Sequence, residues 1–328
     1  MDQDLPLPLV SVVIPTHNAR NHLRECLHSM DKTKYPNYEV IVVDAACTDG
    51  TYEMLRKDFP DVKVFRVGDI GYGETNNHGM IRAQGEYIVS ICDDYTVHAN
   101  WLDELVKVIS PSKDIGIVGG KVYSYGTKNT IVFAGRKITI SLLGIVWGFG
   151  SVREREEYDE IRETVFSPVP MVRRDILPIV GLWDPDYFLQ FDDTDFCFRV
   201  RKAGFRLVYV PTSITWHKIG GTTPLGSPRS VYYTYRNRIR FMMKNFPAYA
   251  LLTAMPLSFV PFLRAALTFI LHNEFKHFKA LLRAFIWNLE HMRETIQARK
   301  YPFYQSFKRL PPQLVTHFIA RASRRSLA

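Results

Sequence analysis

Two adjacent carboxylates follow an apolar run in the first third of the sequence. The stretch "YIVSICDDYTV" (87–97) is largely apolar from Tyr87 to Cys92 and then has Asp93 beside Asp94. Like charges side by side repel, so the pair indicates either a turn that faces water or a cation that both carboxylates hold. Mg²⁺ and Mn²⁺ commonly bind one or two carboxylates and complete their shell with water and substrate phosphates. The pair alone leaves both interpretations open.

A second acidic cluster lies in "FDDTDF", at the start of a predicted helix. Some of it is explained by structure alone, because acids favour helix N-termini and Asp195 can pair with Arg199 one turn later. Asp192, Asp193 and Asp195 together exceed what a helix cap needs. A carboxylate that faces a metal-binding crevice can instead take a proton from a hydroxyl as a general base.

His217 is the third candidate, in "SITWHKIGG" after an apolar strand pattern. A single histidine is usually packed or solvated. As a neutral imidazole at a strand end, it can also complete a metal shell.

The elements that must position these residues alternate along the N-terminal half. Continuous β-branched runs predict buried strands, and amphipathic patterns between them predict helices. This rhythm is typical of an α/β fold, a mostly parallel sheet with right-handed crossovers and helices on both faces. Ligands of such sheets bind beyond the carboxyl ends of the strands, where Asp44, Asp93 and Asp94 would meet. We expect strands at 9–15, 39–45, 62–67 and 86–94, and helices at 21–30, 48–59 and 76–85.

The remaining chain changes character twice. Residues 115–166 read as short strands and glycine-rich turns, a loop-like insertion, and 186–230 as a helix followed by a strand. Beyond residue 230, long basic and apolar helices are expected. We therefore predict a catalytic domain over 1–228 and a helical region over 229–328.

Composition supports a globular protein, with 46% hydrophobic and 23% charged residues. Four cysteines lie far apart, which favours reduced thiols in a cytosolic compartment. The N-terminal "MDQDLPLPLV" lacks the pattern of a secretory signal.

Charge is divided unevenly. From residue 229 onward there are 17 Lys and Arg against 3 Asp and Glu, a net +14, whereas residues 1–228 carry 25 against 30, a net −5. A basic region can meet nucleic acid or an anionic membrane. Nucleic acid would leave the acidic clusters unexplained, so we expect no nucleic-acid partner.

The stretch 248–271 is long enough to cross a membrane, since about 20 apolar residues suffice. It holds one charge, Arg264, and two interior prolines, which argue against a simple crossing. We expect an interfacial or re-entrant pair of helices, with a soluble helical subdomain as the alternative. The cations expected at the lipid headgroups are Arg236, Arg238, Arg240 and Lys244. Alternatively, Arg236 or Arg238 grips a diphosphate. The final "RASRRSLA" is expected to be a solvated tail.

The order of these motifs resembles a known family. "VSVVIPTHN", "VIVVDAACTDGT", "NNHGMIRAQGEYIVSICDDYTV" and "LQFDDTDFCFRVRKAGFRLVYVP…WH" are similar to the family 2 inverting glycosyltransferases with a GT-A fold. The resemblance covers about residues 9–220 and is greatest to the branch that includes rhamnosyltransferases and related cell-surface glycan enzymes.

The resemblance implies a role for each matching residue. Asp44 would hydrogen-bond a pyrimidine base, Asp94 would be the last residue of the metal-binding D-x-D motif, and Asp193 would be the catalytic base. His217 would lie near the metal and the diphosphate. The expected nucleotide-sugar contacts are Pro15, Thr16, Asn18, Asp44, Asn77 and Asp93.

Three departures from the family pattern stand out. Cys92 replaces the first aspartate of D-x-D, which puts the affinity and choice of metal in question. Asp192 replaces a glutamate before the base, and "AAC" replaces the usual Asn-Gly-Ser after Asp44.

The implied reaction is a metal-dependent single displacement with inversion. A sugar would pass from a UDP- or dTDP-sugar to a hydroxyl of a glycan or polyprenyl-linked acceptor, with Mg²⁺ or Mn²⁺ as cofactor. The basic, apolar C-terminal region suggests work at the cytoplasmic face of the membrane, in polysaccharide synthesis for the cell envelope.

Rival interpretations remain. A glycoside hydrolase also uses two carboxylates, but it does not need the "PTHN" turn and Asp44 of a nucleotide pocket. A nucleotidyltransferase usually has a glycine-rich phosphate loop near the N-terminus, which this sequence lacks. A degenerate, nucleotide-binding scaffold is supported by Cys92.

Two aromatic residues, Trp183 and Tyr187, either stack on a sugar or belong to the core.

Overall fold

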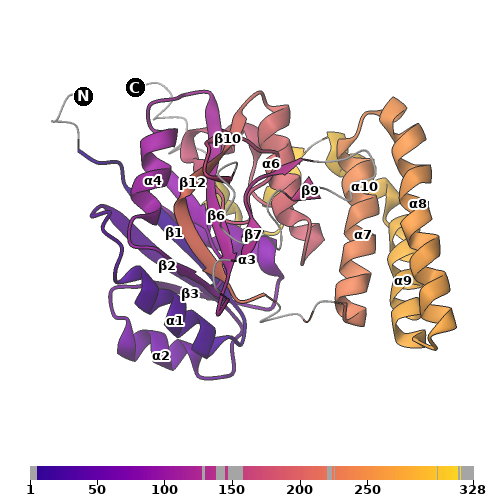
Figure 1. Cartoon of the computed structure of the whole chain (residues 1–328), viewed down its shortest axis with the longest axis horizontal. Helices are drawn as coiled ribbons and strands as arrows, with labels where there is room; N and C mark the ends of the chain where they lie inside the picture. The colour runs from indigo at the N-terminus through magenta and orange to yellow at the C-terminus, as the bar shows by residue number, and fades with distance from the viewer. Residues whose placement is uncertain are drawn as a thin grey trace.

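The computed structural model describes residues 6–127, 130–137, 145–146, 158–219, 224, 226–300, 302–316 and 318. Its N-terminal half alternates strands and helices as predicted (Figure 1). The third helix begins four residues earlier than expected. The fourth strand ends at Ser90, so Asp93 and Asp94 lie beyond it and not in it. The elements are β1 (Val10–Thr16), α1 (Arg20–Met30), β2 (Tyr38–Ala45), α2 (Thr51–Asp58), β3 (Lys63–Val67), α3 (Tyr72–Met80) and β4 (Tyr87–Ser90).

The second half of the sheet domain adds shorter strands and the helix of the second acidic cluster. The predicted helix and strand within 186–230 are confirmed as α6 and β12. The elements are β5 (Tyr95–Val97), α4 (Trp101–Ile109), β6 (Ile115–Ser124), β7 (Ile131–Phe133), β8 (Arg136–Lys137), β9 (Ile145–Val146), β10 (Arg162–Glu163), β11 (Met171–Arg173), α5 (Leu177–Val180), α6 (Asp192–Lys202) and β12 (Arg206–His217), with 3₁₀ turns at Arg174–Ile176 and Pro185–Tyr187.

These strands form one mixed sheet in the order β10-β12-β6-β11-β4-β1-β2-β3. The strands β4, β1, β2 and β3 pair in parallel, as do β6 and β12. The short β11 runs antiparallel between β4 and β6 and joins the two parallel parts. The α/β class predicted from the alternation is confirmed, and the carboxyl ends of β1 and β2 meet at one edge.

The prediction of a loop-like insertion from residue 115 is wrong for β6, a ten-residue strand inside the sheet. Its glycines suggested turns, but they mark close packing within the sheet. A Cβ at Gly116 would lie 2.7 Å from Phe205 Cβ, and Cβ atoms at Gly119 and Gly120 would collide with Ser167 and Ser213. Part of the charged segment after residue 152, like the final "RASRRSLA", lies outside the described residues.

The C-terminal region is a layer of helices beside the sheet domain (Figure 1). The helix α7 adjoins the sheet domain, α9 packs on α7, and α8 packs on α9 and α7. Residues after α10 return to the sheet domain, where Phe307, Leu310 and Phe318 join its core. The helices are α7 (Pro228–Asn245), α8 (Ala248–Leu271), α9 (Phe275–Glu290), α10 (Met292–Lys300) and α11 (Pro302–Phe307).

The apolar stretch 248–271 is a single helix, α8, which continues through Pro256 and Pro261. The expected pair of helices within this stretch is therefore wrong. By length and composition α8 is the one helix in the described part of the chain that is able to cross a membrane, with a mean hydropathy of 1.7. Only 11% of the most apolar 18-residue stretch of α8 is buried, so the rest of the protein covers little of this helix.

Three of the four cations expected at lipid headgroups are buried instead. Arg236, Arg240 and Lys244 are 5%, 0% and 2% exposed, and they face the sheet domain. Their spacing of four residues places them on one side of α7, whereas the prediction rested on the net positive charge of this region and the apolar stretch 248–271. Because these three side chains are buried, this side of α7 packs against the sheet domain of the same chain. The prediction that they lie at lipid headgroups is therefore corrected.

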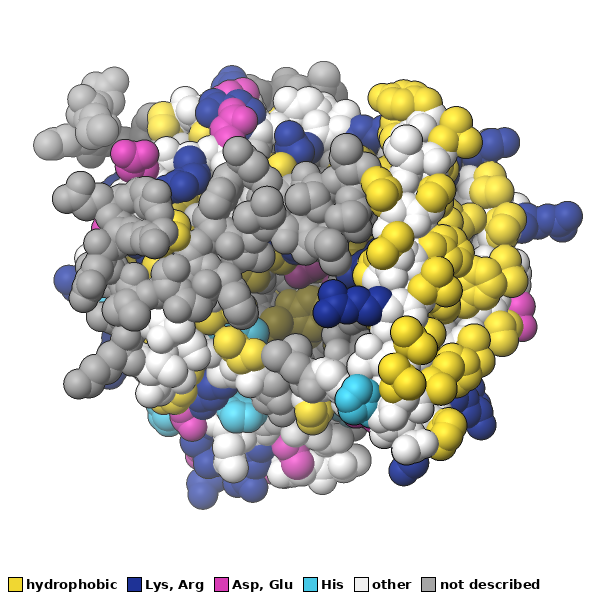
Figure 2. Space-filling view, turned by 45° about the vertical axis from the view of Figure 1, so that its right-hand side comes forward, with side chains coloured by type: hydrophobic (Ala, Val, Ile, Leu, Met, Phe, Trp, Pro, Cys, Tyr) yellow, Lys and Arg dark blue, Asp and Glu magenta, His cyan; other side chains and the backbone are white. Residues whose placement is uncertain are grey.

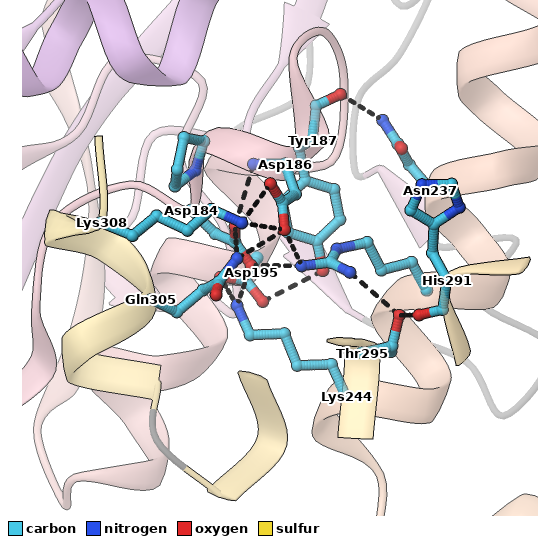
Figure 3. A network of polar contacts seen from close by, with 12 residues as sticks. Asp184, Asp186, Tyr187, Asp195, Asn237, Lys244, His291, Thr295, Gln305 and Lys308 are labelled. Atoms are coloured by element: carbon cyan, nitrogen blue, oxygen red, sulfur yellow. Dashed lines mark hydrogen bonds and ion pairs between the residues drawn. The ribbon is translucent and has the colours of Figure 1, made fainter. Parts of the chain in front are cut away.

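The junction is a network of buried ion pairs (Figure 3). Lys244 Nζ lies 2.7 Å from Asp184 Oδ2 and 2.9 Å from Asp195 Oδ2, and Arg240 Nη2 lies 2.9 Å from Asp186 Oδ2. Burial by itself would raise the pKa of Asp184, but Lys244 and Arg240 hold that pKa well below its usual value. The network joins α7 to α6, because Asp195 belongs to α6 and also pairs with Arg199 at 2.8 Å.

Candidate active site

The short strand β5 brings two predicted metal ligands together. It pairs antiparallel with β12, with Tyr95 opposite His217, and the two rings stack with centroids 4.2 Å apart. His217 Nε2 then lies 3.3 Å from Asp94 Oδ2. The other oxygen, Asp94 Oδ1, is buried and has no hydrogen-bond partner within the described residues. Such an oxygen is costly to bury unless something binds it.

Asp93 turns away from this pair and toward β1. Its Oδ2 accepts a hydrogen bond of 2.7 Å from Thr16 Oγ1. Burial raises the pKa of Asp93 to about 7, although the Thr16 hydroxyl opposes the shift. The two neighbouring carboxylates therefore have different surroundings: Asp93 fixes the end of β1, and Asp94 faces His217.

The predicted base-binding residue lies at the same sheet edge as Thr16. The register of β1 and β2 pairs Thr16 with Asp44, whose side chain is fully buried. Asp44 Oδ1 accepts a hydrogen bond of 2.8 Å from the backbone N–H of Cys47. Its Oδ2 forms an ion pair at 3.1 Å with Arg66 Nε.

Two further predicted nucleotide contacts flank this edge. Pro15 is buried inside β1, next to Thr16. Asn18 adopts a positive φ of 50° just after β1, which asparagine tolerates better than most residues. Its Oδ1 accepts a hydrogen bond of 2.8 Å from the N–H of Thr48, so Asn18 links the loops that follow β1 and β2.

Asn77 is not brought into the crevice. It is fully buried, and its amide forms hydrogen bonds of 2.8 and 2.9 Å with the backbone of Trp183. It also donates to the carbonyl of Ser306 at 3.3 Å. In this structure Asn77 fixes the segment that leads to the acidic helix.

The predicted general base lies at the start of α6, after a strained loop. Phe188, Gln190 and Phe191 have positive φ angles of 61°, 65° and 66°. Such angles cost non-glycine residues about 1–3 kcal/mol each and cluster at functional sites. The loop presents Asp193, which is partly exposed, while Asp192 is buried with Oδ2 unpartnered among the described residues.

Asp193 has one oxygen anchored and a perturbed pKa. Its Oδ1 accepts hydrogen bonds of 2.6 and 3.2 Å from the N–H and hydroxyl of Thr194. Burial raises the pKa of Asp193 above the ordinary value of 3.8, while Thr194 and the positive charge of Arg136 oppose the rise. A raised carboxyl pKa suits a residue that must accept a proton.

Arg136 adds positive charge near Asp193, and Arg238 lies near Arg136. No sequence pattern pointed to Arg136, because it follows the glycine-rich stretch interpreted as an insertion. Burial lowers the pKa of Arg238, and the neighbouring charge of Arg136 lowers it further. Arg236, the other cation considered for a diphosphate, instead donates to the backbone carbonyls of Asp186 and Tyr187, each at 2.6 Å.

Cys92, which replaces the first aspartate of D-x-D, carries a neutral thiol. Its Sγ donates to the Tyr72 hydroxyl at 3.2 Å. Burial, and after it the charge of Asp94, raises the pKa of the Cys92 thiol well above its usual value. The charge of Asp192 acts in the same direction, so the two acidic segments of the sequence lie in one site.

The site can hold a divalent cation with few protein ligands. Within the described residues, no group of three or more His, Cys, Asp or Glu side chains has a metal-binding arrangement. Asp94 and His217 fit a cation as a pair, because Asp94 Oδ1 lacks another partner. A cation held this way completes its shell with water and substrate phosphates, as Mg²⁺ and Mn²⁺ do.

The two aromatic residues considered for sugar stacking belong to the core. Trp183 and Tyr187 are 1% and 0% exposed. Trp183 stacks on Phe196 with centroids 5.3 Å apart, and the Tyr187 hydroxyl donates to Asp195 Oδ1 at 3.1 Å. The alternative of core packing is therefore confirmed.

Ligands of an α/β sheet bind beyond the carboxyl ends of its strands, and the acidic residues of this chain gather there. Residues 11–177 match the profile of the family described as "Glycosyl transferase family 2". The chain belongs to this family and has its GT-A-like fold.

Curated relatives agree with the family. The chain is 30% identical over 227 residues to the uncharacterized protein y4gI of Sinorhizobium fredii, covering 64% of this chain and 24% of that protein. It is 26% identical over 219 residues to the glycosyltransferase AglE of Haloferax volcanii, covering 64% of this chain and 67% of that protein. The matched part is therefore about a quarter of the length of y4gI and about two thirds of the length of AglE.

Solved structures share the fold. The mannosyltransferase PcManGT from Pyrobaculum calidifontis, in complex with GDP-Man and Mn²⁺, has a TM-score of 0.54 at 16% identity over 98% of this chain and 87% of its own. GalNAc-T7 with UDP, GalNAc and Mn²⁺ has a TM-score of 0.57 at 20% identity over 73% of this chain and 49% of its own.

Proposed function

We propose that this protein is an inverting glycosyltransferase that moves a sugar from a nucleotide-diphosphate donor to a hydroxyl of an acceptor. The supporting observation is the convergence of Asp94, His217 and Asp193. Asp94 and His217 lie 3.3 Å apart. Burial raises the pKa of the Tyr95 hydroxyl, and the charges of Asp94 and Asp193 raise it further. The ring of Tyr95 stacks on His217.

Each residue has one task in the proposed reaction. Asp193 accepts the proton of the acceptor hydroxyl while that oxygen attacks the anomeric carbon from the face opposite the leaving diphosphate. The configuration at that carbon inverts. Asp94 and His217 would hold a divalent cation, Mg²⁺ or Mn²⁺, and when bound there it would supply positive charge against the diphosphate. Arg238, half-buried near Arg136, is positioned to add positive charge beside the same group.

The donor nucleotide would lie along the edge formed by Thr16, Asn18 and Asp44. Asp44 Oδ2 is buried without a hydrogen-bond partner among the described residues, so it can accept a hydrogen bond from a base beside the Arg66 guanidinium, which lies 3.1 Å away. One solved neighbour holds UDP and another holds GDP-Man, so the donors to test are UDP-, dTDP- and GDP-sugars, dTDP-rhamnose among them. Asn77 would act by fixing the Trp183 segment and not by direct contact.

The exposed apolar helix α8 suggests that the reaction takes place at a membrane surface, on the cytoplasmic face. Figure 2 shows hydrophobic side chains gathered along the outer helices, with Lys and Arg side chains around them. This pattern is typical of helices that lie in a membrane interface. The exposed apolar side chains of α8 are Tyr249, Leu252, Leu257, Val260, Leu263, Leu267, Ile270 and Leu271. A polyprenyl-linked acceptor of a cell-envelope glycan fits such a location.

Metal-dependent binding of a nucleoside diphosphate tests the proposed site. Calorimetric titration with UDP, dTDP and GDP, with and without Mn²⁺ or Mg²⁺, is expected to show one preferred nucleotide whose affinity rises with metal. Asp94→Asn should lower that metal-dependent affinity at least about tenfold, because it removes an anionic ligand.

Asp93→Asn is the matched control, since the Asp93 carboxyl faces Thr16. It is expected to retain the metal effect on binding. An equal loss in both variants would show that both carboxylates hold the cation. No binding of any nucleotide in the presence of metal would favour the degenerate scaffold.

Membrane association makes a separate prediction. Val260→Glu with Leu267→Glu places two charges on one stripe of α8 and should weaken binding to anionic vesicles roughly 100-fold, because burying each side chain is worth about 1.5–3 kcal/mol. Vesicle sedimentation measures the effect. The control, Gln84→Glu with Ser110→Glu, adds the same charge at exposed positions of the sheet domain. A wild-type protein that ignores anionic vesicles would contradict this part of the proposal.

A further inference from the structure

A groove lies between the loop that precedes α6 and the helices α7 and α9. Its volume is about 830 Å³, which is enough for a drug-sized ligand. Arg229 of α7 lines it on one side, and Lys276, Lys279 and Arg283 of α9 line it on the other. It does not include Asp94, His217 or Asp193.

The cations of this groove form no ion pair with the carboxylates of the described residues. Lys276, Lys279 and Arg283 recur at intervals of three and four residues, which places them on one side of α9. They and Arg229 are exposed, and none forms an ion pair within the described part of the chain. Glu290 is the single acidic residue among the described lining residues. The groove thus carries a net positive charge, unlike the junction at Lys244, where buried cations meet carboxylates.

Aromatic rings form the wall between these cations. Phe188 and Tyr233 stack with centroids 5.5 Å apart and planes 11° apart. The Arg229 guanidinium lies 5.9 Å from the centre of the Phe188 ring. Trp287 lines the groove as well. A groove with apolar walls and cations at its edge suits an amphiphilic anion better than a small free ion.

The groove is continuous with the exposed apolar surface. Ile286 lines the groove, is 48% exposed, and lies between Leu282 and Leu289, which are 41% and 53% exposed. These side chains extend the apolar face proposed to meet a membrane. A lipid in that membrane therefore has a route to the cations without crossing a polar surface.

The groove is also close to the proposed catalytic base. Phe188 precedes Asp193 by five residues, a length of chain that spans at most about 18 Å. The carbonyl of Phe188 accepts a hydrogen bond of 2.8 Å from the N–H of Tyr72, and the Tyr72 hydroxyl contacts Cys92 in the active site. An anion bound beside Phe188 would place an attached sugar toward Asp193.

We propose that this groove binds the diphosphate of a polyprenyl-linked acceptor, with Lys279 and Arg283 as its main phosphate contacts. The inference rests on the proposed glycosyl transfer and names where the acceptor is held. Lysine and arginine are the usual phosphate-binding side chains, and the aromatic wall would contact the first part of the lipid chain.

The test compares binding of the full chain to three kinds of vesicle. These are neutral phosphatidylcholine, phosphatidylcholine with a few per cent of a long-chain polyprenyl diphosphate, and phosphatidylcholine with phosphatidylglycerol at equal negative charge. We expect the wild-type protein to prefer the polyprenyl diphosphate. Lys279→Gln with Arg283→Gln should lower affinity for those vesicles roughly 30-fold, since each lysine or arginine near an anionic surface contributes about a fivefold effect.

Arg293→Gln with Lys300→Gln is the matched control, because it removes two exposed cations of α10 that do not line the groove. It should keep the preference for the diphosphate. Equal loss in both double variants, or no preference over phosphatidylglycerol, would overturn the groove as a site. Competition by free pyrophosphate or a soluble anionic glycan at the lipid's own concentration would overturn the lipid assignment.

The vesicle measurement contains no donor nucleotide. Failure of the groove proposal therefore leaves glycosyl transfer standing. Conversely, a protein that binds the polyprenyl diphosphate but transfers no sugar would contradict the proposed function alone.

Discussion

Replacing Asp193 by Asn is expected to lower the rate of sugar transfer by about two to four orders of magnitude, the usual contribution of a general base. The amide has nearly the same shape as the carboxylate and its oxygen can still accept the hydrogen bonds of Thr194. It cannot take a proton from an attacking hydroxyl. Metal-dependent binding of the donor nucleotide should stay near that of the wild type, because the residues assigned to the nucleotide are unchanged.

Steady-state turnover and calorimetric binding, measured on the same preparation, separate these two effects. A variant that keeps more than a tenth of wild-type turnover would show that another group takes the proton. A variant that loses nucleotide binding as well would place Asp193 in donor binding and not in proton transfer.

The pH dependence of turnover gives a second measure of the same residue. The base acts when deprotonated, so the rate should fall as pH falls through the pKa of Asp193, which burial raises above 3.8. Arg136 opposes that rise. Arg136→Met should therefore move the acidic limb of the profile to higher pH, whereas a purely structural role for Arg136 would lower turnover without moving that limb.

Much of the N-terminal half was predictable, because local pattern and tertiary structure agree there. The run at β1 is fully buried, and the run at β2 is buried from Ile41 onward. Both are β-branched, so the continuous apolar pattern alone identifies them. The strand β6 was missed because its glycines are also turn signals. Only the packing of Gly116 against Phe205 shows why they stand in a strand, and that packing joins residues 89 positions apart in sequence.

The site was predicted at the level of residue types but not of geometry. Asp93 and Asp94 are equivalent in the sequence. They differ in the structure because β5 pairs with β12 and turns Asp94 toward His217, leaving Asp93 to Thr16. Tertiary pairing also determined the outcome for Asn77, whose amide is taken by the backbone of Trp183.

The basic C-terminal region was the least predictable part. A net charge counted from the sequence does not show which cations are paired with carboxylates in the fold. A region with a large positive net charge therefore suggests a membrane surface. Lys244 is instead matched by Asp184 and Asp195, which lie 60 and 49 residues earlier in the chain. No local pattern shows such pairing. The cations of α9 that remain unpaired are those proposed to bind the acceptor.

Lys244→Met is expected to have the largest effect on stability. It removes the cation that Asp184 and Asp195 share, and leaves Asp184 with Arg240 and Asp195 with Arg199 as partners. Breaking one side of a buried ion pair typically costs about 3–5 kcal/mol. Denaturant unfolding of the variant and the wild type measures the difference in the free energy of unfolding. Lys308→Met is the control. Lys308 is 37% exposed where it pairs with Asp186, so its loss should cost about 1 kcal/mol or less.

The pH dependence of the loss identifies its cause. Lys244 helps keep the pKa of Asp184 well below 3.8, so its stabilising effect is present at neutral pH and is lost only as pH falls through that low pKa. Without Lys244, only Arg240 and Arg199 oppose the effect of burial on these two carboxyls, so their pKa values rise and protonation can relieve the excess negative charge. The cost of Lys244→Met should therefore be smaller at pH 4 than at pH 8. A cost that does not change with pH would mean that lost packing, and not unpaired charge, destabilises the variant.

The same variant tests whether the junction supports catalysis. Asp195 follows Asp193 by two residues in α6, and the strained loop before α6 is bonded to α7 through Arg236 and Asn237. Asp184→Asn with Lys244→Met removes one carboxylate together with the cation and should recover part of the stability. If turnover recovers with stability, α7 acts through folding of the whole domain. If stability returns and turnover stays low, the Lys244–Asp195 contact positions the start of α6, and with it Asp193.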